Sequence, residues 1–537
     1  MQQYLLSLLI FTPLIAALIA LFIPSSFEKF FRMIALVCSL VQILVLVRLL
    51  ISYEPSLSLQ FVEQKPWISL DLGSWGILKA QYFVAIDGLN IIFVCLAVFI
   101  MFIAGISSWI INKNVKGYFV LLLILNAAIV GTFTALDFLL FYLFFEFMLL
   151  PMFFLIGMWG GPRSEYASIK FFLYTLLGSI LILIVLIGLY LSVQDPDQSA
   201  RVVHTFNLLQ MTAPENFIRD SIFDPANPWM IGSLNAREWG FLLLFFGFAI
   251  KLPMVPLHTW LPDAHVEAPT PVSVVLAALL LKIGGYGLMR IAFPVFPEAA
   301  LGFSWLIGLL GVISILYGAL NAMASKDLKR LIAYSSVSHM GFVLLGLASM
   351  TTEGVTGSIY QMFSHGIISA LLFLIAGVLS DRTHDRTIDH YSGLATKMPA
   401  YFSIVLIGFF ASMGLPGFSG FIAEIMVFLG AFKSNSVNGL IHESLAVIST
   451  LGLILGAGYY LWTIQRMFFG KFHVKGEDKM ELLTPLSARE YMVMVPLCVA
   501  AFLFGIFPQL ILDWINPYTE HFVNTILDTG KRLTLNL

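Results

Sequence analysis

Charged residues are scarce in this sequence. Only 11% of its 537 residues are Asp, Glu, Lys or Arg, whereas 59% are hydrophobic and the mean hydropathy is +0.91. A soluble domain typically carries about 25% charged residues, so this composition indicates an integral membrane protein. The formal net charge of −2 excludes a basic protein that binds nucleic acid.

Cysteines and the motifs of many soluble enzymes are also rare or missing. Cys38, Cys95 and Cys498 lie far apart in apolar runs and form no CxxC pair, which argues against iron–sulfur ligation and a disulfide framework. No dinucleotide-binding or P-loop glycine pattern is present, so we expect the chain to bind neither NAD nor ATP. His258 and His265 flank TWLPDA without the HExxH spacing of a metal site. We therefore expect no cofactor and no metal in this chain.

Long apolar runs are abundant. At about 20 residues per crossing, the sequence predicts fourteen transmembrane segments, at 4–23, 31–52, 87–110, 117–135, 136–158, 170–192, 239–260, 272–292, 302–322, 328–348, 359–379, 400–431, 445–467 and 490–512. The first run lacks a positively charged start and reaches spanning length, so we interpret it as a helix and not as a signal peptide. The run 400–431 is too long for one straight span.

The polar connections are mostly short, and no separate soluble domain is evident. The connection 53–86 contains short alternating stretches that suggest a hairpin, and the connection 193–238 is rich in Pro, Asp and Asn. The predicted fold is an all-α integral membrane protein with one polytopic domain over residues 1–537.

The basic residues are distributed unevenly across the predicted membrane. Loops after odd-numbered segments carry 17 of the 29 Lys and Arg residues, and most of the others lie in the two long connections or the C-terminal tail. Short loops rich in Lys and Arg remain in the cytoplasm. We therefore expect a multi-pass protein of the bacterial inner membrane with both termini on the periplasmic side.

A few ionisable side chains lie at predicted membrane depth, where a charge costs roughly 2.5–3.5 kcal/mol on insertion scales. They are Glu146, Lys251, Lys282, Glu424, His339 and His365. A lysine near a helix end can extend to the interface, which applies most to Lys282, and His339 among serines is equally explained as an interhelical hydrogen bond. Four charges spread over four segments nevertheless favour a polar axis inside a helix bundle, and such residues are functional hypotheses by default.

Two segments are interrupted beside these charges. Pro253 and Pro256 follow Lys251 and free backbone carbonyls that lipid cannot satisfy. The stretch GLPGFSG interrupts a second segment shortly before Glu424. Interrupted helices at corresponding places are typical of transporters built from inverted repeats.

The spacing of the breaks predicts two repeats. Leu252-Pro253 and Leu415-Pro416 are 163 residues and five segments apart, and an odd number of segments inverts the second unit. We therefore expect two five-helix repeats, 117–292 and 302–467, with discontinuous helices seven and twelve. Because burial disfavours the charged forms of lysine and glutamate, such residues can exchange protons near neutral pH, and a row of them forms a path for protons.

Five blocks of this sequence resemble one family throughout. The blocks are FFEFMLLPMFFLIGMWG (144–160), FAIKLPMVPLHTWLPDAHVEAPTPVSVVLAALLLKIGGYGLMR (248–290), SKDLKRLIAYSSVSHMG (325–341), FSHGIISALLFL (363–374) and LPGFSGFIAE (415–424). They are similar to the antiporter-like membrane subunits of respiratory complex I, the proton-translocating NADH:quinone oxidoreductases. Together they are highly specific, and the resemblance covers nearly the whole chain.

The resemblance implies roles for individual residues. Glu146 and Lys251 match the family's paired glutamate and lysine of helices five and seven, and Lys282 matches the central lysine of helix eight. Glu424 matches the acid of broken helix twelve. A glutamate there, where sister chains have lysine, is typical of the M-type (chain 4) branch.

Three further positions fit the family pattern. His339 and His365 fall where the family places bridging polar groups of helices ten and eleven. Asp137, nine residues before Glu146, resembles an acid at the membrane edge of helix five. The connection 193–238 is longer than usual, which affects only the outer surface.

The function implied is proton translocation by one subunit of a larger translocase, coupled to NADH:quinone electron transfer elsewhere. FMN, iron–sulfur clusters and quinone (ubiquinone in many respiratory chains) are then expected in partner subunits, with no redox centre in this chain. The implied partners are sister antiporter-like subunits on both sides, small membrane subunits and lipid. Alternatives are a subunit of a multicomponent cation/proton antiporter, a subunit of a hydrogenase-type or ferredoxin-dependent complex, and a mere scaffold, which leaves the broken helices unexplained.

Overall fold

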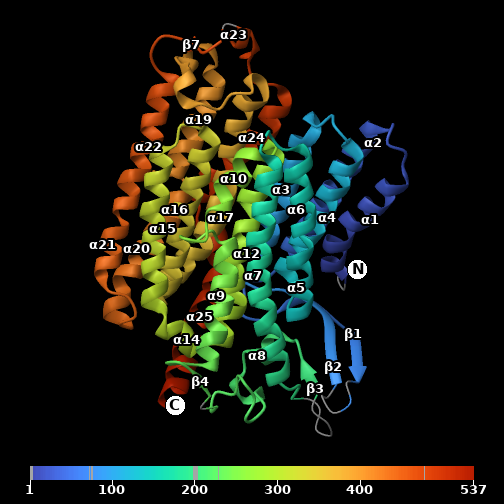
Figure 1. The fold of residues 1–537 in the computed structure, drawn as a ribbon, viewed down its shortest axis with the longest axis vertical. Coiled ribbons are helices and arrows are strands. Elements are labelled where there is room, and N and C mark those ends of the chain that lie inside the picture. Colours follow the sequence, from blue (N-terminus) through green and yellow to red (C-terminus); the bar gives the residue numbers. More distant parts are fainter. Residues whose placement is uncertain are drawn as a thin grey trace.

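The helices of this protein run alongside one another along the long axis of the molecule (Figure 1). The computed structural model describes residues 4–71, 73, 77–196, 203–227, 229–476 and 478–536. In these residues, 13 helices are long and apolar enough to cross a membrane. The broken pair α9–α10, described below, occupies the remaining one of the fourteen predicted segments. The predicted all-α membrane fold is thus confirmed.

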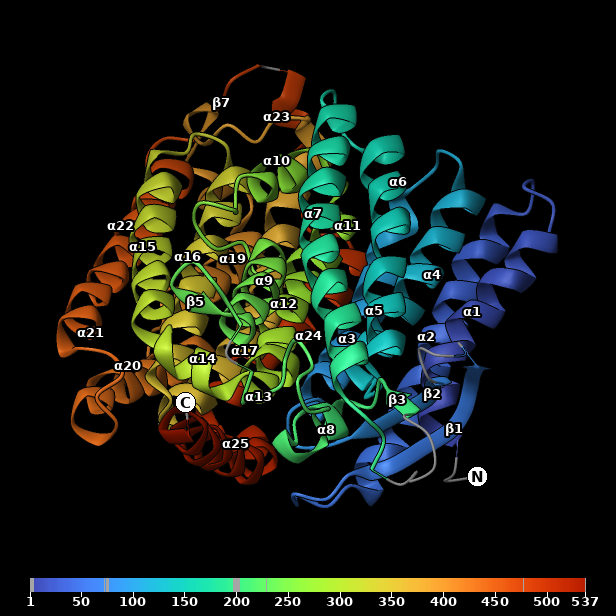
Figure 2. The same ribbon diagram turned by 60° about the horizontal axis from the view of Figure 1, so that its bottom comes forward.

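The predicted hairpin lies between the second and the third helix of the sequence. The first three helices are α1 (Leu5–Phe22), α2 (Glu28–Ser52) and α3 (Ile91–Ser107). Between α2 and α3, β1 (Gln60–Asp71) pairs antiparallel with β2 (Ile77–Ile86). β2 also pairs in parallel with β3 (Val203–Thr205). The two long connections therefore form one sheet, at the lower end of the molecule in Figure 1 and Figure 2.

The first half of the bundle contains several interrupted helices. Its elements are α4 (Val115–Thr134), α5 (Phe138–Phe147), α6 (Leu149–Trp159), α7 (Ser164–Ser192), α8 (Leu208–Met211), α9 (Ala236–Lys251), α10 (Trp260–Glu267), α11 (Thr270–Val275), α12 (Leu281–Gly287) and α13 (Phe293–Val295). Two π-helical segments, Leu276–Leu280 and Leu288–Ala292, flank α12. A π turn inside an α-helix is rare and frequently marks a functional site.

The second half contains the other predicted break. Its helices are α14 (Pro297–Gly302), α15 (Ser304–Ala324), α16 (Leu328–Ser349), α17 (Thr352–Thr383), α18 (Leu394–Lys397), α19 (Pro399–Ser412), α20 (Ser419–Val437), α21 (Glu443–Ser449), α22 (Leu451–Phe468), α23 (Asp478–Leu482), α24 (Ala488–Ile506) and α25 (Gln509–Asn536). The run 400–431 is divided between α19 and α20, as its length predicted. Short strand pairs β4–β5 (Met230–Ile231, Leu234–Asn235) and β6–β7 (Tyr391–Ser392, His473–Val474) lie in loops.

Side-chain caps fix the starts of several helices. Asn235 and Glu238 form a reciprocal capping box at the start of α9, and Ser487 and Glu490 form another at α24. These side chains satisfy backbone N–H groups that have no partner within a helix. The caps place the helix ends at the polar loops, where the sequence changes from charged to apolar.

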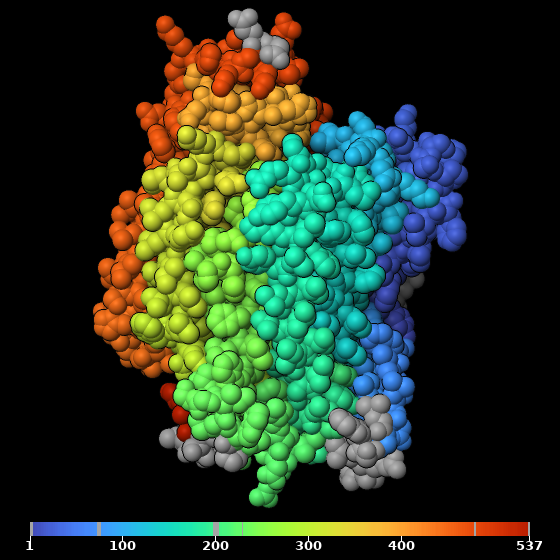
Figure 3. Space-filling model, viewed as in Figure 1, coloured from blue at the N-terminus to red at the C-terminus, as the bar shows by residue number. Residues whose placement is uncertain are grey.

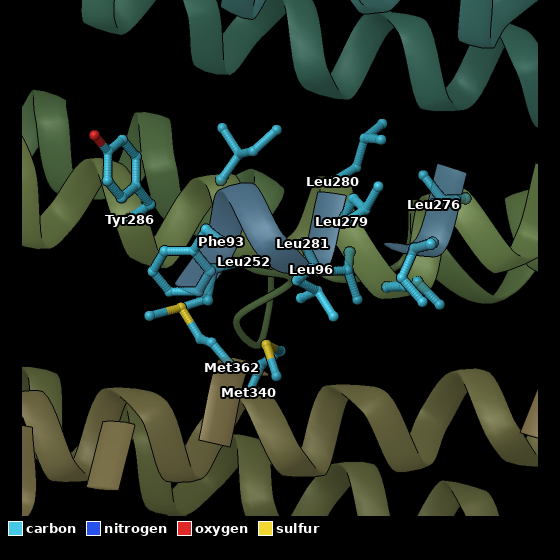
Figure 4. Close-up of a cluster of buried hydrophobic side chains, with 14 of the residues drawn as sticks. Phe93, Leu96, Leu252, Leu276, Leu279, Leu280, Leu281, Tyr286, Met340 and Met362 are labelled. Atoms are coloured by element: carbon cyan, nitrogen blue, oxygen red, sulfur yellow. The ribbon is translucent and has the colours of Figure 1, made fainter. Parts of the chain in front are cut away.

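Three helices form the interior of the bundle. Within the most apolar 18 residues of each span, all residues of Thr270–Val295 and of Thr352–Thr383 are buried and 94% of those of Leu328–Ser349, compared with only 33% of those of α2. Apolar side chains from five segments meet around α12, as Figure 4 shows. They include Phe93, Leu96, Leu252, Leu276, Leu279, Leu280, Leu281, Tyr286, Met340 and Met362. Polar groups on these helices are therefore shielded from lipid.

The two ends of the bundle differ. The hairpin, α8 and α25 lie at the lower end, and β7 and α23 lie at the upper end (Figure 1). α25 packs against α14 and α17 and lies across the lower end (Figure 2). In the space-filling view, orange-red segments protrude at the upper end and a green segment protrudes at the lower end (Figure 3).

Candidate functional site

Lys282 lies in the centre of the bundle and not at its surface. It is on α12, between the two π-helical segments, and its side chain is fully buried. Its ammonium nitrogen Nζ lies 2.5 Å from the carbonyl oxygen of Ala277, in the first π-helical segment, and 2.7 Å from His365 Nδ1. The interpretation that Lys282 extends to the interface is therefore wrong.

Two histidines connect Lys282 with Glu424. His365 on α17 and His339 on α16 are buried, and their ring centroids are 5.5 Å apart. His339 Nδ1 lies 3.5 Å from Glu424 Oε1, on α20. The structure thus brings together four of the six predicted residues in the order Lys282, His365, His339, Glu424.

A small cavity lies along this row. The volume open to the centre of a water-sized sphere is about 10 Å³, which is about the space that one water molecule needs. Its lining includes both histidines, Glu424, Gln361, Ser364 and Ser412. A water molecule with several polar partners can bridge the gap between the two rings, and water-mediated hydrogen bonds are nearly as favourable as direct ones.

The break between α19 and α20 shapes the environment of Glu424. This carboxylate is buried, 5% exposed, in the second turn of α20. Gly414, in the break, has a φ of +69°, and a Cβ atom built there would collide with Glu424 Oε2. The glycine therefore supplies both the left-handed turn and the space that the carboxylate occupies.

The break after α9 places Lys251 at a helix end. Lys251 is the last residue of α9 and is 3% exposed. Its Nζ donates to the carbonyl of Phe145 at 3.2 Å and lies over the Phe145 ring. A cation over an aromatic face is stabilised by the negative potential of that face.

The backbone groups released by this break have partners within the protein. The carbonyl of Ala249 accepts from the backbone of Met254, and the carbonyl of Ile250 accepts from Trp260 Nε1 at 2.9 Å. The N–H of Val255 donates to Ser314 Oγ at 3.1 Å. The predicted discontinuity is therefore stabilised by hydrogen bonds, and lipid need not satisfy these groups.

Glu146 lies beside Phe145 but does not bridge to Lys251. It is half-buried near the end of α5, and within the described part of the chain its Oε1 has no hydrogen-bond partner. Among the described ion pairs, none joins Glu146 to Lys251. Lys251 contacts Phe145, the residue before Glu146. The lysine and the glutamate are therefore close to each other but not paired, which we call the separated arrangement.

The glycine-rich stretch after Lys282 allows α12 to approach the break in α9. A Cβ atom at Gly284 would lie 2.6 Å from the carbonyl oxygen of Phe248 and from the backbone nitrogen of Leu252. Only glycine fits such a close approach. Within the described residues, no hydrogen bond connects the group of Glu146 and Lys251 with the row that begins at Lys282.

Several polar residues at the site were not predicted. Gln361 and Ser412 contact His339 at 3.2 Å each. Tyr460 contacts Ser412 at 2.7 Å and donates to Ser335. The sequence held one signal, because Gln361 stands one helical turn before His365. Ser412 and Tyr460 lie in apolar runs that gave no such signal.

An ion pair at the lower end of the interior was also not predicted. Arg290 Nη1 and Asp87 Oδ2 are 2.6 Å apart and both side chains are 7% exposed.

Asp137 caps α5 by accepting from Leu140 N at 3.0 Å and from Gln81 N at 2.9 Å. The acid expected at the membrane edge therefore holds the helix start against the hairpin.

A multi-pass bundle with two interrupted helices, and with a lysine or a glutamate beside each interruption, has the architecture of an ion-translocating membrane subunit. The chain belongs to the NADH:quinone oxidoreductase/Mrp antiporter transmembrane family, whose model matches residues 135–450. It is 40% identical over 528 residues to NADH-quinone oxidoreductase subunit M of Rhodobacter capsulatus, covering 97% of each chain. It is 37% identical to NADH-ubiquinone oxidoreductase chain 4 of Arabidopsis thaliana, covering 96% of this chain and 97% of that one.

Solved structures give the same result for the fold. A chain of respiratory complex I from Thermus thermophilus with bound NADH is similar with a TM-score of 0.79 and 28% identity, covering 98% of this chain and all of that chain. A chain of the Mrp complex from Dietzia sp. has a TM-score of 0.78 at 18% identity, over 98% and 99% of the chains, which shows the shared fold alone. The predicted resemblance to the M-type branch is confirmed.

Proposed function

We propose that this chain is the M-type, antiporter-like membrane subunit of an NADH:quinone oxidoreductase and moves protons across the membrane. The observation that carries the proposal is the buried row from Lys282 through His365 and His339 to Glu424, in a chain whose relatives are subunits of that enzyme. Charged and titratable groups in the interior of a membrane bundle are costly and mark ion pathways.

Proton transfer begins at Lys282. Its ammonium group donates to His365 Nδ1, and the proton crosses when the ammonium loses it and the imidazole gains it. The proton then passes from His365 to His339, directly or through one water molecule in the cavity. His339 delivers it to Glu424, and the carboxylate becomes a neutral acid. Each step moves one proton between groups within hydrogen-bonding reach or one water apart.

The Glu146–Lys251 pair controls the charge near this row. In the separated arrangement, the ammonium of Lys251 lies at Phe145. If Lys251 moves to Glu146, the two charges neutralise each other, and the positive potential at Lys282 falls. A less positive potential favours protonation of a lysine. Lys282 therefore takes up a proton when the Glu146–Lys251 pair closes and releases it when the pair opens.

The rest of the translocase lies in partner subunits. NADH oxidation with FMN and iron–sulfur clusters, and quinone reduction, belong to those subunits, and their charge movements drive the pair described above. Exposed apolar residues on α1 and α2 on one flank, and on α21 and α22 on the other, fit sister subunits on both sides, together with small membrane subunits and lipid. The expected location is the bacterial inner membrane.

The proposal is tested by measuring proton pumping in inverted membrane vesicles that carry Glu146→Gln or Lys251→Ala. We expect the complex to assemble and NADH-driven pumping to fall by roughly tenfold or more in each, as for the loss of a proton-transfer group. Assembly is checked by the amount of complex on native gels. Wild-type proton stoichiometry in both assembled variants would contradict the proposal.

The same preparation separates this function from that of a multicomponent cation/proton antiporter. The family includes Mrp antiporters, and the Dietzia structure shares the fold. The complex that this chain forms with its partners should carry bound flavin, iron–sulfur clusters and NADH-oxidising activity. A complex that exchanges cations for protons and has none of these would belong to the antiporter class.

A further inference from the structure

Gln361 and Glu424 face the same nitrogen of His339. Gln361 is on α17, and its amide nitrogen Nε2 lies 3.2 Å from His339 Nδ1. Glu424 Oε1 lies 3.5 Å from that same Nδ1. The amide oxygen Oε1 of Gln361 is buried and, among the described residues, has no hydrogen-bond partner. Gln361 and Glu424 therefore compete for Nδ1 of His339, and the amide oxygen of Gln361 still lacks a hydrogen bond.

The other ring nitrogen of His339 has a partner that accepts either protonation state. Nε2 lies 3.2 Å from Ser412 Oγ, which in turn contacts Tyr460 OH at 2.7 Å. A hydroxyl can both donate and accept a hydrogen bond. The contact with Ser412 therefore does not determine which nitrogen of His339 is protonated. The groups near Nδ1, Gln361 and Glu424, must determine it.

An amide side chain distinguishes the two states, because its nitrogen only donates and its oxygen only accepts. While Gln361 Nε2 faces Nδ1, that nitrogen must be unprotonated, and His339 has no proton to give Glu424. When the amide turns by half a rotation, Oε1 faces Nδ1 and accepts from an N–H there. Both orientations occupy nearly the same volume, because the oxygen and the NH₂ group of an amide are similar in size.

We propose that Gln361 is a positioning residue whose amide orientation determines which nitrogen of His339 carries the proton, and so controls delivery to Glu424. The inference rests on the function proposed above. Protonated His339 has N–H on both nitrogens, and Gln361 Oε1 accepts from Nδ1. Transfer breaks this N–H bond and forms an O–H bond on Glu424. The amide then turns, donates to the vacated Nδ1 and opposes return of the proton.

Other titratable groups lie close to the contact between Gln361 and His339, and any pH measurement must take them into account. From four elements they are Glu424 on α20, His365 on α17, Lys282 on α12 by way of His365, and Tyr459 and Tyr460 on α22. Substitutions at Gln361 leave all of these groups in place. A change in the pH profile of Gln361→Met therefore reports the lost partner of Nδ1, whereas Gln361→Glu also adds a titrating carboxyl group.

The test compares Gln361→Met with Gln361→Glu in the assembled complex. Methionine fills similar space but neither donates nor accepts strongly, so Nδ1–H loses its acceptor. We expect NADH-driven pumping near pH 8 to fall by roughly tenfold and the pH profile of this variant to move to lower pH. A glutamate only accepts when ionised, so it stabilises Nδ1–H. We expect the profile of this variant to move to higher pH and its maximal rate to stay within about threefold of wild type.

The control is Ser358→Ala on the same helix, α17, because the Ser358 hydroxyl donates to the carbonyls of Val343 and Gly354 and does not contact His339. It should keep the wild-type pH profile. Opposite shifts for the two Gln361 variants support the inference. Unshifted profiles, or equal losses at every pH, overturn it and assign Gln361 a packing role. If Gln361→Met does not assemble, Gln361→Glu decides, since only an upward shift supports the inference.

The outcome is separable from failure of the proposed function. Lys251→Ala is measured in the same vesicles. If Lys251→Ala abolishes pumping while both Gln361 variants follow the wild-type profile, only the role of Gln361 is wrong. If Lys251→Ala pumps normally, the proposed function itself is wrong, whatever the Gln361 variants do.

Discussion

Gly414 determines where the carboxylate of Glu424 can lie. Its backbone has a φ of +69°, and a Cβ atom there would overlap Glu424 Oε2. Gly417, three residues later, has a φ of +96° but no heavy atom within 4 Å of its Cβ position. The two glycines share a conformational requirement, but only one of them makes room for a functional group. This difference provides a matched pair of substitutions.

We expect Gly414→Ala and Gly417→Ala each to cost about 1–2 kcal/mol, because a left-handed backbone is unfavourable for alanine. Only Gly414→Ala should also reduce proton pumping, by displacing Glu424 from His339. Thermal stability of the complex and NADH-driven pumping in vesicles measure the two effects separately. Equal pumping in both variants would show that the carboxylate does not need this position.

At the residue scale, sequence reasoning identified charged groups but not their partners. Lys282, Glu424 and the two histidines stand out because they interrupt apolar runs. The contact between Arg290 and Asp87 joins residues that are 203 positions apart, and no local pattern encodes such a distance. Gln361 was missed for another reason, since a neutral amide in a membrane helix is common as an interhelical hydrogen bond.

At the scale of elements, α5 and α16 begin in the same way. Asp137 and Asp327 are their N-caps, and both have φ −98° and ψ 128°. Each accepts from the backbone nitrogen three residues later, at 3.0 Å. Each also forms a β-bridge to a later connection, with Asn207 and Thr387 respectively. These connections lie at opposite ends of the bundle, which supports the proposal of two inverted repeats.

The two caps should contribute similar amounts of stability. Replacing an N-cap Asp by Ala costs about 0.5–2 kcal/mol, so we expect Asp137→Ala and Asp327→Ala to lower the thermal stability of the complex comparably. Asparagine caps equally well, so Asp137→Asn should keep the cap on Leu140 N but lose the acceptor for Gln81 N, because an amide has only one acceptor oxygen. At Asp327 the asparagine variant should lose more, because there the second oxygen, Oδ2, pairs with the charged Arg386 Nε at 3.0 Å. Equal losses for alanine and asparagine at position 137 would show that the cap on Leu140 N contributes little there.

Hydropathy and proline placement predicted the elements well for physical reasons. Spans follow from the length of apolar runs, and the breaks at Pro253 and Pro416 follow from missing backbone donors. The π-helical segments around α12 could not be predicted, because an extra residue in one turn leaves no mark in composition. The pairing of β2 with β3 joins the connection 53–86 to the connection 193–238, and no local pattern predicts the register of that contact.

At the scale of the whole molecule, the distribution of basic residues predicts the orientation in the membrane. The exposed residues Ser58, near β1, and Lys471, near β7, lie at opposite ends of the bundle. Of the native cysteines, Cys38 and Cys498 are buried and Cys95 is half-buried. A cysteine introduced at either end can therefore be labelled selectively.

We expect a membrane-impermeant thiol reagent to label Ser58→Cys in cells whose outer membrane has been made permeable. The reagent should label Lys471→Cys only in inverted vesicles, because Lys-rich loops remain in the cytoplasm. The parent chain without added cysteine is the control for background labelling. The reverse pattern would place both termini in the cytoplasm and contradict the proposed orientation.

The narrowness of the cavity between the two histidines also determines which ions can travel this way. A sodium ion would have to shed its hydration shell and find replacement oxygen ligands at a fixed spacing. The space here admits about one water molecule, so a sodium ion would enter it without most of its hydration shell, and only the oxygens of Glu424, Gln361, Ser364 and Ser412 could replace that water. A proton needs no such shell, since it hops along hydrogen bonds. If protons take this route as proposed above, the cost of removing the hydration shell of sodium, and not charge alone, favours protons, and a chamber wide enough for a hydrated ion would lose that preference.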